Sequence, residues 1–171
     1  MSDNFKRNLR LVADPGKASR QFADDGFTLV EILAIIVILG ILTSSAVVMY
    51  QNYRTKAMNN AAMAQIGNIQ EAINQYRENN DSYPDDLSQI PGGQQLDPWQ
   101  RPFQYLNIAN GGPNWHGKCR RDRKLNPLNT DFDLYSMGAD GKTATPLTAQ
   151  ASQDDIVRAN NGFFIGLGSD Y

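Results

Sequence analysis

The stretch Gly26-Phe27-Thr28-Leu29-Val30-Glu31 and the apolar run over residues 32–49 decide how the rest of the chain is organised. Residues 32–53 contain no charged side chain. A helix over residues 27–48 has a length that, at about 1.5 Å per residue, just spans a hydrocarbon core of about 30 Å. Because the run is apolar on every face rather than on one stripe, it predicts a membrane span and not a buried core helix.

Glu31 is the single acidic residue of this apolar segment. A carboxylate inside hydrocarbon is costly, so it needs a positive partner or a proton. No Lys or Arg follows it before Arg54, and we therefore expect the partner to come from elsewhere. Cleavage after Gly26 would make Phe27 a new N-terminus, whose amine would neutralise Glu31 of the same or a neighbouring chain.

The segment from Gly26 to Glu31 resembles the processing signal of type IV pilin-like proteins. In that family a prepilin peptidase cuts after the glycine and methylates the new first residue. The resemblance implies that Gly26 and Phe27 flank the processing site and that Glu31 serves assembly. The segment differs from a secretory signal peptide because the cut precedes the apolar run and leaves it in the mature protein.

The charges that flank the span predict its orientation. Residues 1–26 contain five basic side chains, whereas only Arg54 and Lys56 lie just beyond the span. By the positive-inside rule the N-terminus stays in the cytoplasm. Together with this orientation, the resemblance implies a protein of the bacterial inner membrane with a cleaved leader over 1–26, a transmembrane segment over 27–52 and a periplasmic head over 53–171, which later joins a periplasmic filament.

Helical periodicity continues beyond the membrane. Apolar residues recur at steps of three and four and predict one face packed on the head domain: Ala62, Ile66, Ile69, Ile73 and Tyr76. The turn-forming run over 79–84, which ends in Pro84, terminates the helix near Asn79. The sequence thus predicts one long helix from Phe27 to about Asn79.

The rest of the head is typical of short strands and loops. One strand is expected near residues 103–106, with Phe103, Tyr105 and Ile108 inward, and another over 132–136. The predicted fold class is α+β: a long N-terminal helix, transmembrane in its first half, packed on a small antiparallel sheet of about three strands. Cys119 is the only cysteine, so no intrachain disulfide is possible.

Three further segments resemble the major (G-type) pseudopilin of type II secretion systems: Tyr83-Pro84, residues 97–103 and residues 132–141. The chain departs from that pattern at Gln100, where a glycine is usual, in a longer loop between Asp140 and Asp154, and in its C-terminal tail. The resemblance implies a pilin-like fold and a structural role in secretion.

Nothing in the sequence indicates catalysis. His116 and Cys119 supply two soft ligands where a structural zinc site needs four, and we expect both in a surface loop. No Ser-His-Asp set, phosphate-binding loop or dinucleotide fingerprint is present. We therefore expect no enzymatic activity.

A basic run occupies the loop between the two expected strands, interrupted only by Asp122: Lys118, Arg120, Arg121, Arg123 and Lys124. With Trp115 nearby, such a run is compatible with nucleic-acid binding. A solvated loop, or pairing with acidic residues of an adjacent filament subunit, is the interpretation we favour. The net charge of −2 indicates no partner by itself.

Three acidic residues, Asp140, Asp154 and Asp155, lie in loops with few basic neighbours in the sequence. Calcium takes six to eight oxygen ligands and mixes carboxylates with backbone carbonyls. From the residues alone, solvated loop aspartates remain the alternative. The resemblance to G-type pseudopilins implies a calcium ion held by these three carboxylates, with carbonyls of Met137 and Lys142.

The resulting hypothesis is a structural subunit of a type II secretion pseudopilus. It assembles with copies of itself and with other pseudopilins at an inner-membrane platform, after cleavage by the prepilin peptidase, and drives export of folded proteins across the outer membrane. The alternatives are a type IV pilin, for adhesion or motility, and a competence pseudopilin that carries DNA.

Overall fold

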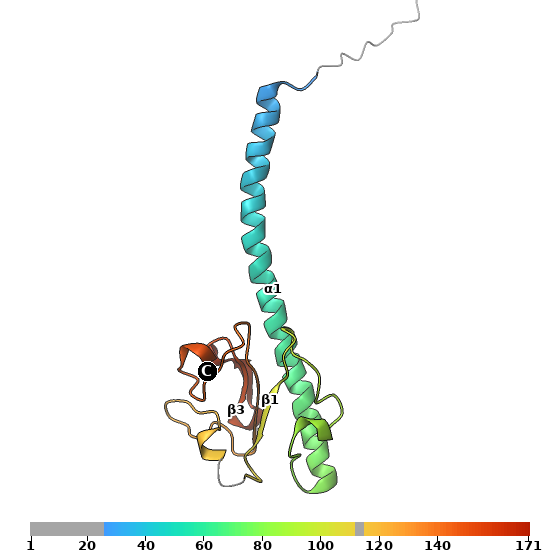
Figure 1. Ribbon diagram of the computed structural model, residues 1–171, viewed down its shortest axis with the longest axis vertical. Coiled ribbons are helices and arrows are strands. Elements are labelled where there is room, and N and C mark those ends of the chain that lie inside the picture. The colour runs from blue at the N-terminus through green and yellow to red at the C-terminus, as the bar shows by residue number, and fades with distance from the viewer. Residues whose placement is uncertain (1–25, 112–114) are drawn as a thin grey trace, which may run out of the picture. The chain divides into compact units, whose positions relative to one another are not determined.

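The computed structural model describes residues 26–111 and 115–171 (Figure 1). The leader expected over residues 1–26 lies, except for its last residue, outside the described residues. The chain divides into two compact units, residues 1–44 and 45–171.

The helix α1 (Leu29–Asn80) supplies the described part of the first unit and continues into the second. In the part of the chain that the structure describes, it is the one helix long and apolar enough to cross a membrane, and its most apolar window has no buried residue. Large aliphatic side chains such as Ile36 and Leu42 are 59% and 60% exposed. An all-round apolar surface of this kind is stable in lipid but not in water.

In the second unit, α1 buries the predicted stripe. Ala62, Ile66, Ile69 and Ile73 are each at most 1% exposed, and Tyr76 packs against the same cluster. The helix ends at Asn80, one residue after the predicted end, and Asp81 takes a left-handed φ of 53°. A left-handed residue directly after a helix is a common terminating geometry.

The head contains a four-stranded antiparallel sheet of order β1-β2-β3-β4, labelled in part in Figure 1. Its strands are β1 (Gln104–Asn107), β2 (Phe132–Ser136), β3 (Ile156–Ala159) and β4 (Phe164–Leu167). The predicted strands near 103–106 and at 132–136 are confirmed. The expected number of three strands is wrong, because the C-terminal tail forms the fourth.

The β3–β4 hairpin is not among the predicted elements, because each strand has only four residues and so gives a weak alternation pattern. Its turn does contain Asn161–Gly162, a hairpin signature, and Phe164 and Ile165 are strand formers. Asn160, Asn161 and Gly162 have φ of 51°, 56° and 93° and reverse the chain, so that Ala159 pairs with Phe164. Asn and Gly tolerate positive φ, which explains their use here. The glycine-containing strand Phe164–Leu167 carries little β-propensity of its own at Gly166.

The sheet has an apolar cluster on each face. Toward α1, Phe132, Leu134 and Ile156 join the helical stripe, together with Ile90 and the inward Phe103. A second cluster is drawn from the loops as well as the strands: Leu128, Leu147, Val157 and Ala159, with Tyr135, Phe164 and Tyr171 packed against them. The loops after β1 and β2 therefore contribute to the core.

Cys119 and Arg120, which we expected in a surface loop, are both buried. Cys119 is 1% exposed and Arg120 is 2% exposed, whereas His116 and the other four cations of the basic run are exposed. Arg120 is held inside by its ion pair with Asp155. The prediction of a wholly solvated basic run is therefore wrong for Arg120, and the exposed positive surface is smaller than the sequence indicates.

Gln100, the departure from the family pattern, has a φ of 66° in the turn between Asp97 and Arg101. This left-handed conformation costs about 1–2 kcal/mol for a residue with a Cβ atom. We expect Gln100→Gly to stabilise the head by about 0.5–1 kcal/mol, after the greater entropy of glycine in the unfolded chain is subtracted. Thermal unfolding of the purified protein measures the shift.

The matched control is Gln94→Gly. Gln94 is exposed, and its φ is not positive. The same substitution there has no strain to relieve and is expected to lower stability. A lower melting temperature for Gln100→Gly as well would contradict the strain argument.

Candidate functional site

The expected processing site lies in an irregular, exposed segment immediately before α1. Gly26 is exposed, and Phe27 is 77% exposed. A Cβ atom built on Gly26 meets no atom within 4 Å, and its φ is not in the left-handed range. Neither packing nor backbone conformation within this chain therefore requires glycine at this position. A remaining reason for glycine is that it lets an enzyme approach the backbone closely at this position.

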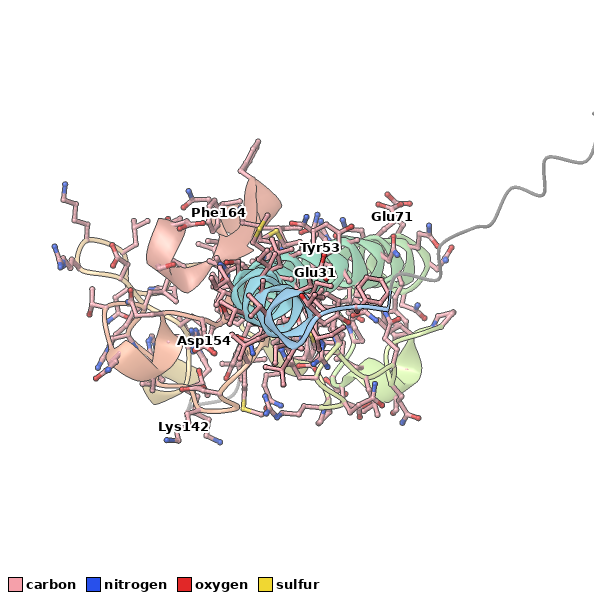
Figure 2. The ribbon with its side chains drawn as sticks, turned by 90° about the horizontal axis from the view of Figure 1, so that it is seen from above. Glu31, Tyr53, Glu71, Lys142, Asp154 and Phe164 are labelled. Atoms are coloured by element: carbon pink, nitrogen blue, oxygen red, sulfur yellow. The ribbon has the colours of Figure 1, made fainter. Side chains whose placement is uncertain are left out.

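Thr28 and Glu31 form a reciprocal cap at the N-terminus of α1, on the helix where Figure 2 labels Glu31. The carboxylate Oε2 of Glu31 accepts the backbone N–H and the hydroxyl of Thr28, each at 2.9 Å. In return, the Thr28 Oγ1 accepts the N–H of Glu31 at 3.2 Å. This is a capping box, for which a Thr three residues before a Glu is the sequence signature.

This cap is not among the features predicted from the sequence, although the spacing of Thr28 and Glu31 is its signature. Glu31 therefore has local hydrogen-bond donors in addition to the positive partner that is expected from elsewhere. Both donors are neutral, so the negative charge itself still has no counter-ion within the described residues of this unit. Hydrogen bonds and a helix N-terminus reduce the cost of that charge without removing it.

The acidic loops of the head are joined by backbone contacts. The N–H of Asp140 donates to Asp154 Oδ2 at 2.9 Å, and the N–H of Lys142 donates to Asp140 Oδ1 at 2.7 Å. Figure 2 shows Asp154 and Lys142 on one side of the head and Phe164 on the other. The structure thus brings the Asp154 carboxylate to the backbone of the turn that bears Asp140 and the predicted carbonyls.

Gly138 allows this close approach. It has a φ of 60°, and a Cβ atom there would lie 2.1 Å from the carbonyl oxygen of Asp154. The turn is further held by Arg101, whose Nη1 and Nη2 donate to the carbonyls of Gly138 and Ala139 at 2.6 and 3.2 Å. Arg101 and Arg120 come from distant parts of the sequence and contact these loops. The expectation of few basic neighbours therefore holds along the sequence but is wrong for the folded chain.

Asp155, the third predicted ligand, is fully buried and paired with Arg120. Its Oδ2 accepts Arg120 Nη2 at 2.6 Å and the Thr143 hydroxyl at 2.7 Å. Burial raises the pKa of the Asp155 carboxyl, whereas the hydrogen bond from Thr143 and the charge of Arg120 oppose that rise. Its Oδ1 is buried and has no hydrogen-bond partner.

These contacts allow cation binding only with help from the backbone. Among residues 26–111 and 115–171, no three His, Cys, Asp or Glu side chains form a metal-binding group. The Met137 carbonyl accepts one long hydrogen bond, from Gly141 N–H at 3.2 Å, and a carbonyl oxygen has a second lone pair. The carboxylates of Asp140 and Asp154, nearby carbonyls and the unpartnered Asp155 Oδ1 suit a hard cation such as calcium.

The His116–Cys119 pair is not arranged as a metal site. The His116 ring stacks on Trp115 at 3.7 Å between centroids, and Cys119 Sγ donates to the His116 carbonyl at 3.3 Å. Burial raises the pKa of the Cys119 thiol, which disfavours the thiolate that would bind a metal or react.

Known proteins are similar to this chain both in the apolar N-terminal segment and over most of its length. Residues 23–47 match the family described as the prokaryotic N-terminal methylation motif. The chain is 32% identical to the type II secretion system core protein G of Pseudomonas aeruginosa over 138 residues, which covers 68% of this chain and 84% of that protein. The corresponding protein of Aeromonas hydrophila is 31% identical over 141 residues, or 70% and 86% of the two chains. No solved structure gives a significant match.

We expect Arg120→Met to destabilise the head by about 3–5 kcal/mol, because it leaves the Asp155 carboxylate buried without its counter-ion. The loss should be smaller at acid pH, where Asp155 takes up a proton and no longer carries the unpaired charge. Denaturant unfolding at neutral and acid pH measures both effects.

Arg121→Met is the matched control, since Arg121 is exposed and the substitution removes the same charge. We expect it to change the free energy of unfolding by no more than about 0.5 kcal/mol. The double variant Arg120→Met/Asp155→Asn should recover part of the loss. Equal, pH-independent effects of Arg120→Met and Arg121→Met would refute the importance of the buried pair.

Proposed function

Since the chain belongs to the family of type II secretion system core protein G and is a membrane-anchored pseudopilin subunit, we propose that it assembles through α1 into a pseudopilus that drives export of folded proteins across the outer membrane. The observation that carries this proposal is the exposed Gly26–Phe27 segment directly before a capped helix whose first part is apolar and exposed. A long apolar surface that is exposed on all sides of the helix must be buried in lipid first and against other subunits later.

The proposal includes maturation by a prepilin peptidase. The residues on both sides of the bond after Gly26 are exposed, and cleavage there leaves the entire apolar segment in the mature chain. We place the N-terminal side in the cytoplasm and the head in the periplasm, because basic residues are more numerous before the span than after it. Other pseudopilins and an inner-membrane assembly platform are the partners that such a filament requires.

Glu31 is proposed to set the register between subunits. The cap from Thr28 orients the carboxylate, and the amine created at Phe27 of a neighbouring subunit supplies the missing positive charge. A pair buried in hydrocarbon tolerates little displacement, because removing either partner leaves an uncompensated charge. Subunits that add to the filament would therefore stop at one axial position.

Two variants separate the charge of Glu31 from its cap. Glu31→Gln retains a side chain that accepts hydrogen bonds at this cap position but carries no charge, and we expect it to abolish filament assembly. Thr28→Val removes the hydroxyl of the cap and keeps the carboxylate, so we expect assembly to persist with a helix weakened by about 1 kcal/mol. Crosslinking ladders and imaging of sheared filaments measure assembly.

Intact mass is the control for both variants. Each should lose residues 1–26 and begin at Phe27, and its mass should include the methyl group that the matched motif implies. Normal filaments from Glu31→Gln, or failure of Thr28→Val alone, would show that the cap and not the charge matters.

We further propose a calcium ion in the head, with Asp140, Asp154 and Asp155, through its Oδ1, as carboxylate ligands and carbonyls of Met137 and Lys142 among the remaining ligands. The contacts between Asp140 and Asp154 support it, as does the unpartnered Oδ1 of the buried Asp155. Arg101 occupies the carbonyls of Gly138 and Ala139 and leaves the two predicted carbonyls to the ion. The ion would supply a crosslink between the turn after β2 and the residues just before β3.

Calcium that binds only the folded head stabilises it by about 2.7 kcal/mol at 100 times its dissociation constant. A fragment that begins at Tyr53 contains both apolar clusters, and EGTA should lower its melting temperature by roughly 10 °C. Calcium should restore it and magnesium should not.

The variant Asp140→Asn should lose this response to EGTA, whereas Asp170→Asn, which removes an exposed charge near the C-terminus, should keep it. A melting temperature of the wild-type fragment that is indifferent to EGTA would exclude the calcium site.

A further inference from the structure

A groove of about 380 Å³ lies between α1 and the turn that bears Trp99, within the second unit. Its helical wall is built from Gln51, Arg54, Thr55 and Met58, and Trp99 forms the other wall. The helical positions are spaced i, i+3, i+4 and i+7 and therefore share one face. The volume is in the range of pockets that hold small molecules or headgroups.

The Trp99 wall is preformed. Asp97, 1% exposed, accepts the backbone N–H groups of Trp99 and Arg101 on Oδ1, at 3.0 and 2.8 Å. Its Oδ2 accepts the hydroxyl of Ser136, in β2, at 2.6 Å. Trp99 also packs against the apolar cluster that includes the isoleucine stripe of α1. The indole is thus fixed opposite the helix, and a ligand need not order this turn.

Arg54 brings a positive charge to the groove. It is exposed and forms no salt bridge with any residue that the structure describes. No acidic residue occurs in the sequence between Glu31 and Glu71, so the surrounding helix attracts anions. A guanidinium offers a planar fork of donors that suits a phosphate group.

The groove begins where the apolar run ends. Arg54 follows Met49 by five residues, which is about 8 Å along a helix and places it at the depth of lipid headgroups when the run is inserted. Tyr50 and Tyr53 are 68% and 74% exposed at the same level. Aromatic side chains beside basic ones are typical of the membrane–water interface.

We propose that this groove binds the headgroup of an anionic phospholipid. Arg54 binds the phosphate, while Trp99 and Met58 contact the polar headgroup beyond the phosphate, because Met58 lies about one helical turn farther from the apolar run than Arg54. This goes beyond the assembly role and depends only on insertion of the apolar segment in a membrane. Free phosphate would use the arginine but would leave the indole and the thioether without a partner, and so a lipid fits better.

The test uses the full-length chain in lipid nanodiscs, in a Trp115→Phe background that leaves Trp99 as the only tryptophan. Quenching of Trp99 by bromine-labelled phosphatidylglycerol is compared with quenching by bromine-labelled phosphatidylcholine. We expect a preference for the anionic lipid. Arg54→Gln should reduce this preference about fivefold, the effect of one basic side chain near an anionic surface.

Lys56→Gln is the matched control. It removes the same charge two residues away, on a face of α1 that does not line the groove, and it should change the preference little. Equal losses in both variants would indicate general attraction to the surface and overturn the proposal. So would an absence of any preference, or a shift of Trp99 emission with inorganic phosphate alone in detergent.

Protection of Trp99 from quenching only when subunits associate would assign the groove to a neighbouring subunit and likewise overturn the proposal. Insertion is measured separately, by retention of each variant in the discs. If the chain is inserted but shows no lipid preference, lipid binding by the groove is refuted and the assembly role is unaffected. If the chain is not inserted, both proposals are refuted.

Discussion

Burial of one isoleucine stripe under one sheet is the constraint on which the head depends. Ile66, Ile69 and Ile73 lie on the face of α1 that the sheet covers, and each is at most 1% exposed. Full burial of such a side chain contributes about 1.5–3 kcal/mol. The same helix carries no comparable stripe before Ala62, where its aliphatic side chains are exposed on all sides. The two parts of the helix therefore need different surroundings because their side chains differ. The first part is stable in lipid, and the second is stable against the protein core.

Whereas α1 is held by apolar packing, the loops around β2 and β3 are stabilised by ion pairs and hydrogen bonds that connect them to the strands. Arg120 Nη1 donates to the hydroxyl of Thr143 and the carbonyl of Ala144, while Nη2 binds Asp155. One guanidinium thus ties together segments remote in sequence, and the backbone N–H of Arg120 donates to Asp133 as well. With a single cysteine, the chain has no disulfide to close these loops. Buried pairs seldom add much net stability, but they favour one arrangement because every alternative leaves a charge uncompensated.

Features that depend on periodicity were predicted from the sequence, and features that depend on long-range contacts were missed. The stripe on α1, the end of that helix and the strand at 132–136 came from local patterns and are confirmed. The fourth strand was missed because it has only four residues and Gly166 interrupts its run of strand formers, although Asn161–Gly162 is a turn signature. Arg120 was misplaced because its partner Asp155 lies 35 residues away. Of the candidate site, the proximity of Asp140 to Asp154 was predicted only through the family resemblance, and no spacing rule would have paired Asp155 with an arginine.

The cap at the start of α1 explains how a carboxylate can remain in the membrane before assembly. Thr28 satisfies the hydrogen-bonding capacity of one Glu31 oxygen, and the positive end of the helix dipole favours a negative charge in the first turn. These two effects lower the cost of the charge without cancelling it. In the proposed assembly, a subunit with a fully neutralised Glu31 would gain nothing from a neighbour's amine, whereas a carboxylate without these hydrogen bonds would be costlier in hydrocarbon. The capping box leaves the charge of Glu31 without a counter-ion in the described residues, which is the condition that the proposed contact between subunits requires.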